Sequence, residues 1–214
     1  MKHRLTLLLA LAASLAAAAQ DGNLGTWASV QASHSWNKTW YGSLRLEHRS
    51  LTATDAQGRR GDLGLDLWFA RATVGAKLLP WLKADLGMDR VQNPDTYKLR
   101  LLPSATLTLK QGHLTASLRE RYVASFTPSA DAANQWSHVL RSYLKVGYHA
   151  PGHLLAPYLA VELYAWEQWQ KTHHFAGVQL RISSRSTLDL FYLFATDKKK
   201  PDAHILGLGY DINI

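Results

Sequence analysis

Apolar and polar residues alternate along most of this chain, a pattern that predicts β-strands with one apolar and one polar face. In the last segment, residues 206–214, leucine, tyrosine and isoleucine alternate with glycine, aspartate and asparagine. Successive side chains of a strand point to opposite faces, so this segment has an apolar side and a small or polar side. A terminal strand of this kind is typical of the strand that closes an outer-membrane barrel.

The same alternation recurs about every eighteen residues, with turn-forming residues between the repeats. The candidate strands cover residues 24–35, 40–51, 68–78, 82–89, 97–110, 114–121, 140–148, 157–166, 173–182, 188–194 and 205–214. Short connections at 37–38, 80, 111–112 and 184–185 alternate with longer, polar ones at 53–62, 127–135 and 197–202. This pattern predicts an all-β fold, an antiparallel transmembrane β-barrel of about 10–12 strands.

The number of candidate strands raises a question of parity. Bacterial single-chain barrels usually have an even number of strands, with both chain ends on the periplasmic side. Here the alternation of short and long connections places the start of residues 24–35 on the rim with the long loops. Either one strand is missed or the first segment is not a full wall strand, and the sequence alone allows both explanations.

The N-terminus predicts export. Lys2, His3 and Arg4 precede an apolar run over residues 5–18, and the small residues Ala16–Ala19 follow. This is the pattern of a secretory signal peptide over residues 1–19, cleaved at about Ala19, which leaves 20–214 as a single outer-membrane barrel domain. The chain has no cysteine, so neither a lipoprotein anchor nor disulfides are expected. We therefore expect the outer membrane of a Gram-negative bacterium as the location.

Tryptophans fall near the ends of the candidate strands, where outer-membrane barrels carry aromatic girdles. The predicted membrane-interface residues are Trp36, Trp40, Trp68, Trp81, Trp136, Trp166 and Trp169. Alternation alone also fits a soluble exported β-barrel that binds an apolar ligand, with its apolar face turned inward. The placement of the tryptophans favours the membrane barrel.

Several segments carry a family resemblance. The order Pro157–Glu162, a polar loop, His174–Leu180, Leu188–Tyr192 and His204–Tyr210 resembles an uncharacterised outer-membrane family, domain of unknown function 2490. The front half agrees through Trp27 and the segment from Trp40 to Arg49. The resemblance implies a small outer-membrane barrel and no particular reaction.

The polar faces predict a charged barrel interior. The side chains expected there are Arg45, Glu47, Arg49, Arg71, Lys77, Lys83, Asp85, Asp89, Arg100, Arg119, Arg121, Arg141, Lys145, Glu162 and Arg181. At 10–12 strands the lumen is narrow enough for long side chains to meet across it, which predicts an ion-paired plug. The alternative is a basic conduit or binding pocket for an anionic solute.

Other chemistry has weaker support. His173 and His174 are adjacent and point to opposite faces, so neither a metal site nor a cofactor is expected. The net charge of +8 is dispersed, so nucleic acid is not an expected partner. Gly207 and Gly209 are expected to make room for lumen arginines.

The predicted function is a non-enzymatic outer-membrane barrel with a structural, surface-interaction or narrow-conduit role. A barrel-embedded lipid or peptide hydrolase is the alternative, with Ser125 or the Ser137–His138 pair as candidates. The expected partners are outer-membrane lipid, lipopolysaccharide phosphates near Lys198–Lys200, and the barrel-assembly machinery, although the terminal Ile214 replaces its usual aromatic signal. The oligomeric state is left open.

Overall fold

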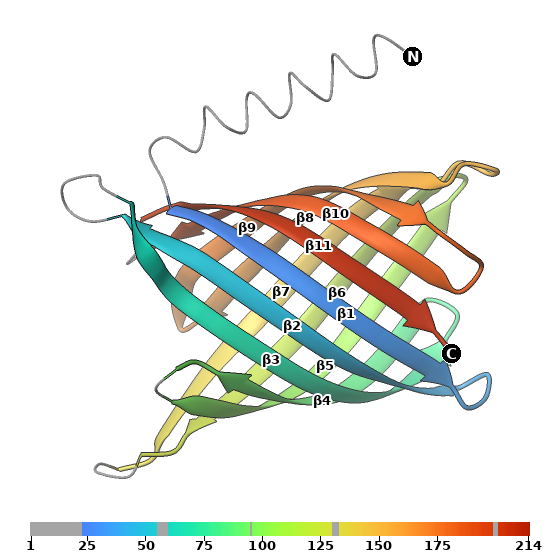
Figure 1. The fold of residues 1–214 in the computed structure, drawn as a ribbon. Helices are drawn as coiled ribbons and strands as arrows, with labels where there is room; N and C mark the ends of the chain where they lie inside the picture. Colours follow the sequence, from blue (N-terminus) through green and yellow to red (C-terminus); the bar gives the residue numbers. More distant parts are fainter. Residues whose placement is uncertain (1–22, 55–59, 95, 130–132, 199–200) are drawn as a thin grey trace, which may run out of the picture.

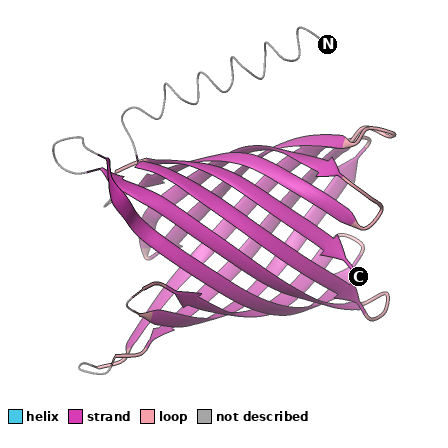
Figure 2. Cartoon of the chain, viewed as in Figure 1, coloured by secondary structure: helices cyan, strands magenta, loops and turns pink. Residues whose placement is uncertain are grey.

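The chain forms a closed β-barrel in the computed structural model, which describes residues 23–54, 60–94, 96–129, 133–198 and 201–214 (Figure 1). The predicted signal peptide, residues 1–19, lies outside the described residues and stays a prediction. The strands are β1 (Asn23–Ser35), β2 (Trp40–Thr54), β3 (Arg60–Leu79), β4 (Leu82–Gln92), β5 (Tyr97–Gln111), β6 (Leu114–Thr127), β7 (Gln135–Tyr148), β8 (Leu155–Trp166), β9 (Gln168–Arg181), β10 (Ser186–Asp197) and β11 (Ala203–Asn213). The described part of the chain is all strand and connecting loop (Figure 2).

No helix in the described ranges is long and apolar enough to cross a membrane.

The barrel closes through a parallel pair of strands. Neighbours in sequence pair antiparallel from β1 to β11, and β1 then pairs with β11 in parallel, from Asn23 opposite Ala203 to Ser33 opposite Asn213. The predicted count of 10–12 strands is confirmed, with eleven strands in the part of the chain that the structure describes. This odd number answers the question of parity, because β1 is a full wall strand. Its parallel pairing with β11, called the parallel seam below, means that β1 and β11 start on the same rim.

The two rims differ in their connections. The short-loop rim joins β1 to β2, β3 to β4, β5 to β6, β7 to β8 and β9 to β10, and it carries the C-terminus. There the amide of Ile214 donates to the carbonyl of Ser33 at 2.8 Å, and the His34 ring lies 2.6 Å from the Ile214 carbonyl. These two contacts continue the parallel seam to the end of the chain. The opposite rim, which carries the other connections, is called the long-loop rim below.

One long-loop connection is shorter than the pattern predicts. β9 begins at Gln168, five residues before the predicted start at His173, and Glu167 alone separates it from β8. Glu167 has a φ of 61°, in the left-handed region that non-glycine residues seldom occupy. Alternation does not reveal a reversal made by one residue in this conformation.

The barrel is apolar outside and polar inside. Outward leucines such as Leu44 and Leu159 expose 66% and 67% of their surface, whereas the inward Asp89 and Glu162 expose 2% each. A soluble barrel has the opposite arrangement, with its apolar side chains inside. The distribution of polarity is that of a barrel whose wall faces an apolar surrounding.

Inward glycines accept aromatic rings from the neighbouring strand. A Cβ on Gly207 would clash with the ring of Phe191, its register partner on β10. Tyr158 covers Gly177 in the same way. The prediction that Gly207 makes room for an arginine was therefore wrong, because the ring of Phe191 occupies that space. Gly209 has Asp189 and Ser29 as its neighbours.

Candidate functional site

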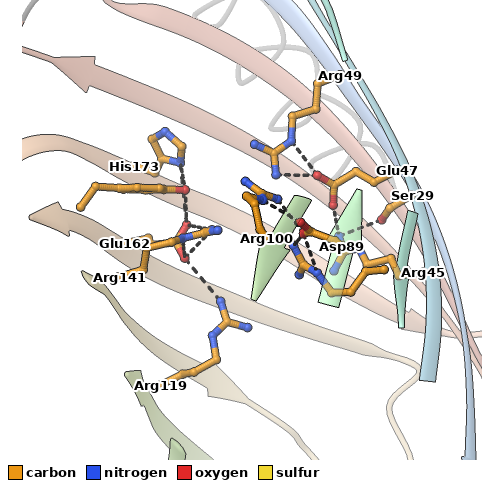
Figure 3. Close-up of polar contacts among 12 residues, drawn as sticks. Ser29, Arg45, Glu47, Arg49, Asp89, Arg100, Arg119, Arg141, Glu162 and His173 are labelled. Carbon is orange, nitrogen blue, oxygen red and sulfur yellow. Dashed lines mark hydrogen bonds and ion pairs between the residues drawn. The ribbon is translucent and has the colours of Figure 1, made fainter. Parts of the chain in front are cut away.

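The lumen contains a buried carboxylate, Glu162 on β8, that four side chains contact. Arg141 on β7 donates from one nitrogen to both carboxylate oxygens, at 2.8 and 2.9 Å. The Tyr164 hydroxyl donates at 2.8 Å, and a guanidinium nitrogen of Arg119 on β6 lies at 3.4 Å. The His173 ring is 3.9 Å away. Strands β6 to β9 thus meet at one carboxylate, which we call the Glu162 cluster (Figure 3).

A second buried carboxylate, Asp89 on β4, joins the two strands beside it. Arg71 on β3 and Arg100 on β5 each approach Asp89 Oδ2 to 2.6 Å, and Arg100 Nε also donates to Oδ1 at 2.6 Å. The register makes these contacts possible, because Asp89 is the direct partner of Arg71 on one side and of Arg100 on the other. Charged groups at this spacing form strong hydrogen bonds.

The third carboxylate, Glu47 on β2, lies between two arginines of its own strand face. Arg49 approaches Glu47 Oε1 to 2.5 Å and Arg45 approaches Oε2 to 2.9 Å. Arg45 also donates to the hydroxyl of Ser29 on β1 at 3.1 Å. Together with Asp89 and its arginines, these side chains form the Glu47–Asp89 cluster (Figure 3).

Aromatic side chains fill the lumen beside the charges. Trp27 on β1 packs edge-on against Phe175 on β9 and Phe191 on β10, with ring centroids 6.4 and 5.7 Å apart. The Arg49 guanidinium lies over the Trp27 ring at 3.5 Å and over the Phe69 ring at 4.5 Å. Such stacking adds a cation–π attraction to the packing. The layer joins strands on both sides of the seam.

The remaining predicted lumen residues lie outside both clusters. Lys145 lies over the Tyr158 ring at 3.7 Å, and Asp85 accepts a hydrogen bond from Tyr41. Lys83 lies near the same Tyr41 ring, at 5.9 Å. Lys77 lies 6.0 Å from the Tyr41 ring, and Arg181 lines a cavity at the short-loop rim. Arg121 lies beside Arg141 in the register of β6 and β7.

Positive charge exceeds negative charge at mid-lumen. The three buried carboxylates Glu47, Asp89 and Glu162 face seven guanidiniums. These are Arg45, Arg49, Arg71, Arg100, Arg119, Arg121 and Arg141. The excess of four positive charges is not matched within this group. The interior is therefore both ion-paired and basic.

The predicted interface tryptophans form two sets near the rims. Trp36, Trp40 and Trp81 lie at the short-loop end and expose 57, 50 and 47% of their surface. Trp68, Trp136, Trp166 and Trp169 lie toward the long-loop end and expose 56, 65, 42 and 44%. Trp27, the remaining tryptophan, is the one that points into the lumen.

The serine and histidine residues considered for hydrolysis do not assemble. Ser137 and His138 are consecutive in β7 and point to opposite faces of the wall. His138 packs outside against Tyr122, with its Nδ1 2.7 Å from the tyrosine hydroxyl. Ser125 is buried in the inward phase of β6, that is, among the alternate residues whose side chains point into the barrel. No three His, Asp or Glu side chains group as a metal site within the described ranges.

Comparison with known proteins agrees with this architecture. Residues 24–204 match the family described as a protein of unknown function, DUF2490. The chain belongs to the DUF2490 family. A solved structure, the NanC porin in a rhombohedral crystal form, matches with a TM-score of 0.52 and 14% sequence identity, over 81% of this chain and 86% of that one. This likeness shows a porin-like barrel fold. No curated protein matches the chain in sequence.

Sequence reasoning missed the aromatic layer and the uncharged members of the Glu162 cluster. Trp27, Phe69 and Phe191 occupy the inward phase of their strands, as the neighbouring charged residues do. Strand phase was therefore a sufficient signal to place them inside. The same signal places Tyr164 and His173 inside, because Tyr164 shares the face of Glu162 on β8 and His173 is the register partner of Glu162 on β9.

Proposed function

We propose that this DUF2490 protein is a non-enzymatic barrel of the Gram-negative outer membrane, closed at mid-height by its ion-paired lumen. The observation that carries the proposal is the inverted polarity of the wall, with exposed leucines outside and buried arginine–carboxylate pairs inside. A wall with an apolar outer band suits lipid. The predicted signal peptide, the lipopolysaccharide contacts and recognition by the barrel-assembly machinery belong to the same proposal.

The closure rests on inward side chains that have almost no accessible surface. Leu193 on β10 and Leu102 on β5 expose 0 and 1%, although each lies in the inward phase of its strand. Side chains along an open aqueous channel would be accessible to water. Packing of this kind, together with the clusters around Glu162 and Asp89, supports a closed lumen.

Two measurements test the proposal. After cell fractionation we expect the protein in the outer membrane, with different migration on gels before and after boiling. In planar bilayers we expect no large conductance steps. Recovery from the soluble periplasm would contradict the location, and steps of the size given by wide porins would contradict the closed lumen.

A narrow anion conduit is the second candidate. The excess of four guanidinium charges at mid-lumen favours it, and the similar fold of a protein named as a porin agrees with it. Small anion-selective steps in the bilayer measurement would support the conduit. A silent bilayer would leave the closed barrel as the function.

A further inference from the structure

Arg121 is a lumen cation that forms no hydrogen bond or ion pair with the residues that the structure describes. It lies in the inward phase of β6, and its Nε is buried with no hydrogen-bond partner among the described residues. The carboxylates of the two clusters are occupied, Glu162 by Arg141 and Arg119 and Asp89 by Arg71 and Arg100. A buried N–H donor without a hydrogen-bond partner is costly and calls for an explanation.

Ser104 is another of the described residues with an unpartnered buried donor, and it lies directly beside Arg121. The two residues are register partners on β5 and β6, both in the inward phase. Ser104 is 9% exposed, and its hydroxyl has no hydrogen-bond partner in the described part of the chain. Directly opposite residues have Cβ atoms about 4.5–5.5 Å apart, so one small group can contact both side chains.

The surrounding charges favour an anion at this point. The cations that act on Arg121 are Arg119, Arg71 and Arg141, and Glu162 is the carboxylate among its main charged neighbours. Arg119 Nε is also buried and has no hydrogen-bond partner within the described ranges. On the far side of Ser104, its β4 register partner Asp85 is engaged by Tyr41. An anion beside Arg121 would therefore compensate part of the excess charge.

We infer that Ser104 and Arg121 form a binding site for a small oxyanion, the carboxylate or phosphate group of an anionic solute. A guanidinium presents paired N–H donors that match either group, and the serine hydroxyl supplies a further donor. Arg121 keeps part of its surface accessible, so an ion can reach it. The inference rests on the proposed barrel and names the class of solute that its lumen holds.

Calorimetric titration of the full barrel, folded in detergent micelles at low ionic strength, tests the site. The probes are inorganic phosphate and acetate, which separate the two sources of an oxyanion. We expect saturable binding of one probe to one site per chain. Arg121→Gln should weaken it at least ten-fold, because a hydrogen bond to a charged group is lost. Arg181→Gln, which removes a lumen cation at the short-loop rim, should leave the affinity unchanged.

Variants of Ser104 distinguish a specific contact with the anion from general electrostatic attraction by the lumen arginines. Ser104→Ala keeps every charge and should weaken binding several-fold, whereas Ser104→Thr keeps the hydroxyl and should restore it. If Arg121→Gln does not fold, the serine pair alone decides. The inference is overturned if neither probe saturates on the native barrel, or if Ser104→Ala binds as the native chain does. The measurement does not depend on conductance, so a silent bilayer and a missing anion site are separate results.

Discussion

Glu162 accepts hydrogen bonds from one Arg141 nitrogen with both of its carboxylate oxygens, at 2.8 and 2.9 Å, inside the barrel wall. The two residues come from adjacent strands, and each is less than a tenth exposed. Breaking a buried pair by removing one partner leaves an uncompensated charge. The stability of the barrel should therefore depend on this carboxylate.

Replacing the carboxylate should weaken the barrel. We expect Glu162→Gln to lower the free energy of unfolding by about 3 kcal/mol or more, since Arg141 then stays buried without its counter-charge. Urea unfolding of the barrel in lipid vesicles measures the effect. Glu167→Gln is the matched control, because Glu167 lies exposed in the β8–β9 turn. Equal stability of the two variants would show that the Glu162 cluster contributes nothing.

The contact between Gly207 and Phe191 predicts a size limit at β11. Gly207→Ala should destabilise the barrel by about 1–3 kcal/mol, because the new Cβ would clash with the Phe191 ring. Gly147→Ala is the control, since its nearest neighbour lies at 3.4 Å. Adding Phe191→Leu to Gly207→Ala should recover part of the loss in the same unfolding measurement. No recovery would mean that the ring is not the obstacle.

The parallel seam predicts which cysteine pair can be joined. Ala28 on β1 and Leu208 on β11 are register partners, and adjacent strands lie about 4.8 Å apart, within the span of a disulfide. The chain has no native cysteine, so Ala28→Cys with Leu208→Cys should form one intramolecular disulfide on oxidation. A shift in mobility on a non-reducing gel detects it. Ala28→Cys with Ile212→Cys, displaced by about 13 Å, should remain reduced. The reverse outcome would contradict the register.

An arginine on the outer wall should cost more at mid-strand than near a rim. Leu208 lies in the middle of β11, and Leu109 lies near the short-loop end of β5. In lipid vesicles Leu208→Arg should lose about 2–4 kcal/mol of folding free energy, and Leu109→Arg about 0–1 kcal/mol, because the cost of a charge depends on its depth. Small and equal losses would indicate a wall that faces water.

Alternation predicted most of the wall because it is a local property of each strand. The segments around Glu47, Asp89 and Glu162 each show apolar and polar faces without reference to any other strand. The β8–β9 reversal was not predictable in this way. Its left-handed residue is Glu167, whereas the usual sequence signal for that backbone conformation is a glycine.

The contents of the lumen were predictable only in part. The alternation within each strand placed both Arg100 and Arg121 inside the barrel, because both lie on the polar face of their strand. Register then gave Arg100 a carboxylate, Asp89, and gave Arg121 a serine and another arginine as its neighbours. Pairing across strands joins residues distant in sequence, so alternation within one strand cannot report it.

The sequence by itself determined that this protein is a β-barrel with charge on one face, since a period of two is imposed by the geometry of every strand. Tertiary structure alone decided the closure. The pattern of residues 206–214 fits the last strand of a barrel with either an even or an odd number of strands. The parallel pairing of β1 with β11 closes the barrel with eleven. That choice depends on backbone hydrogen bonds between the two ends of the chain, where side-chain pattern carries no information about direction.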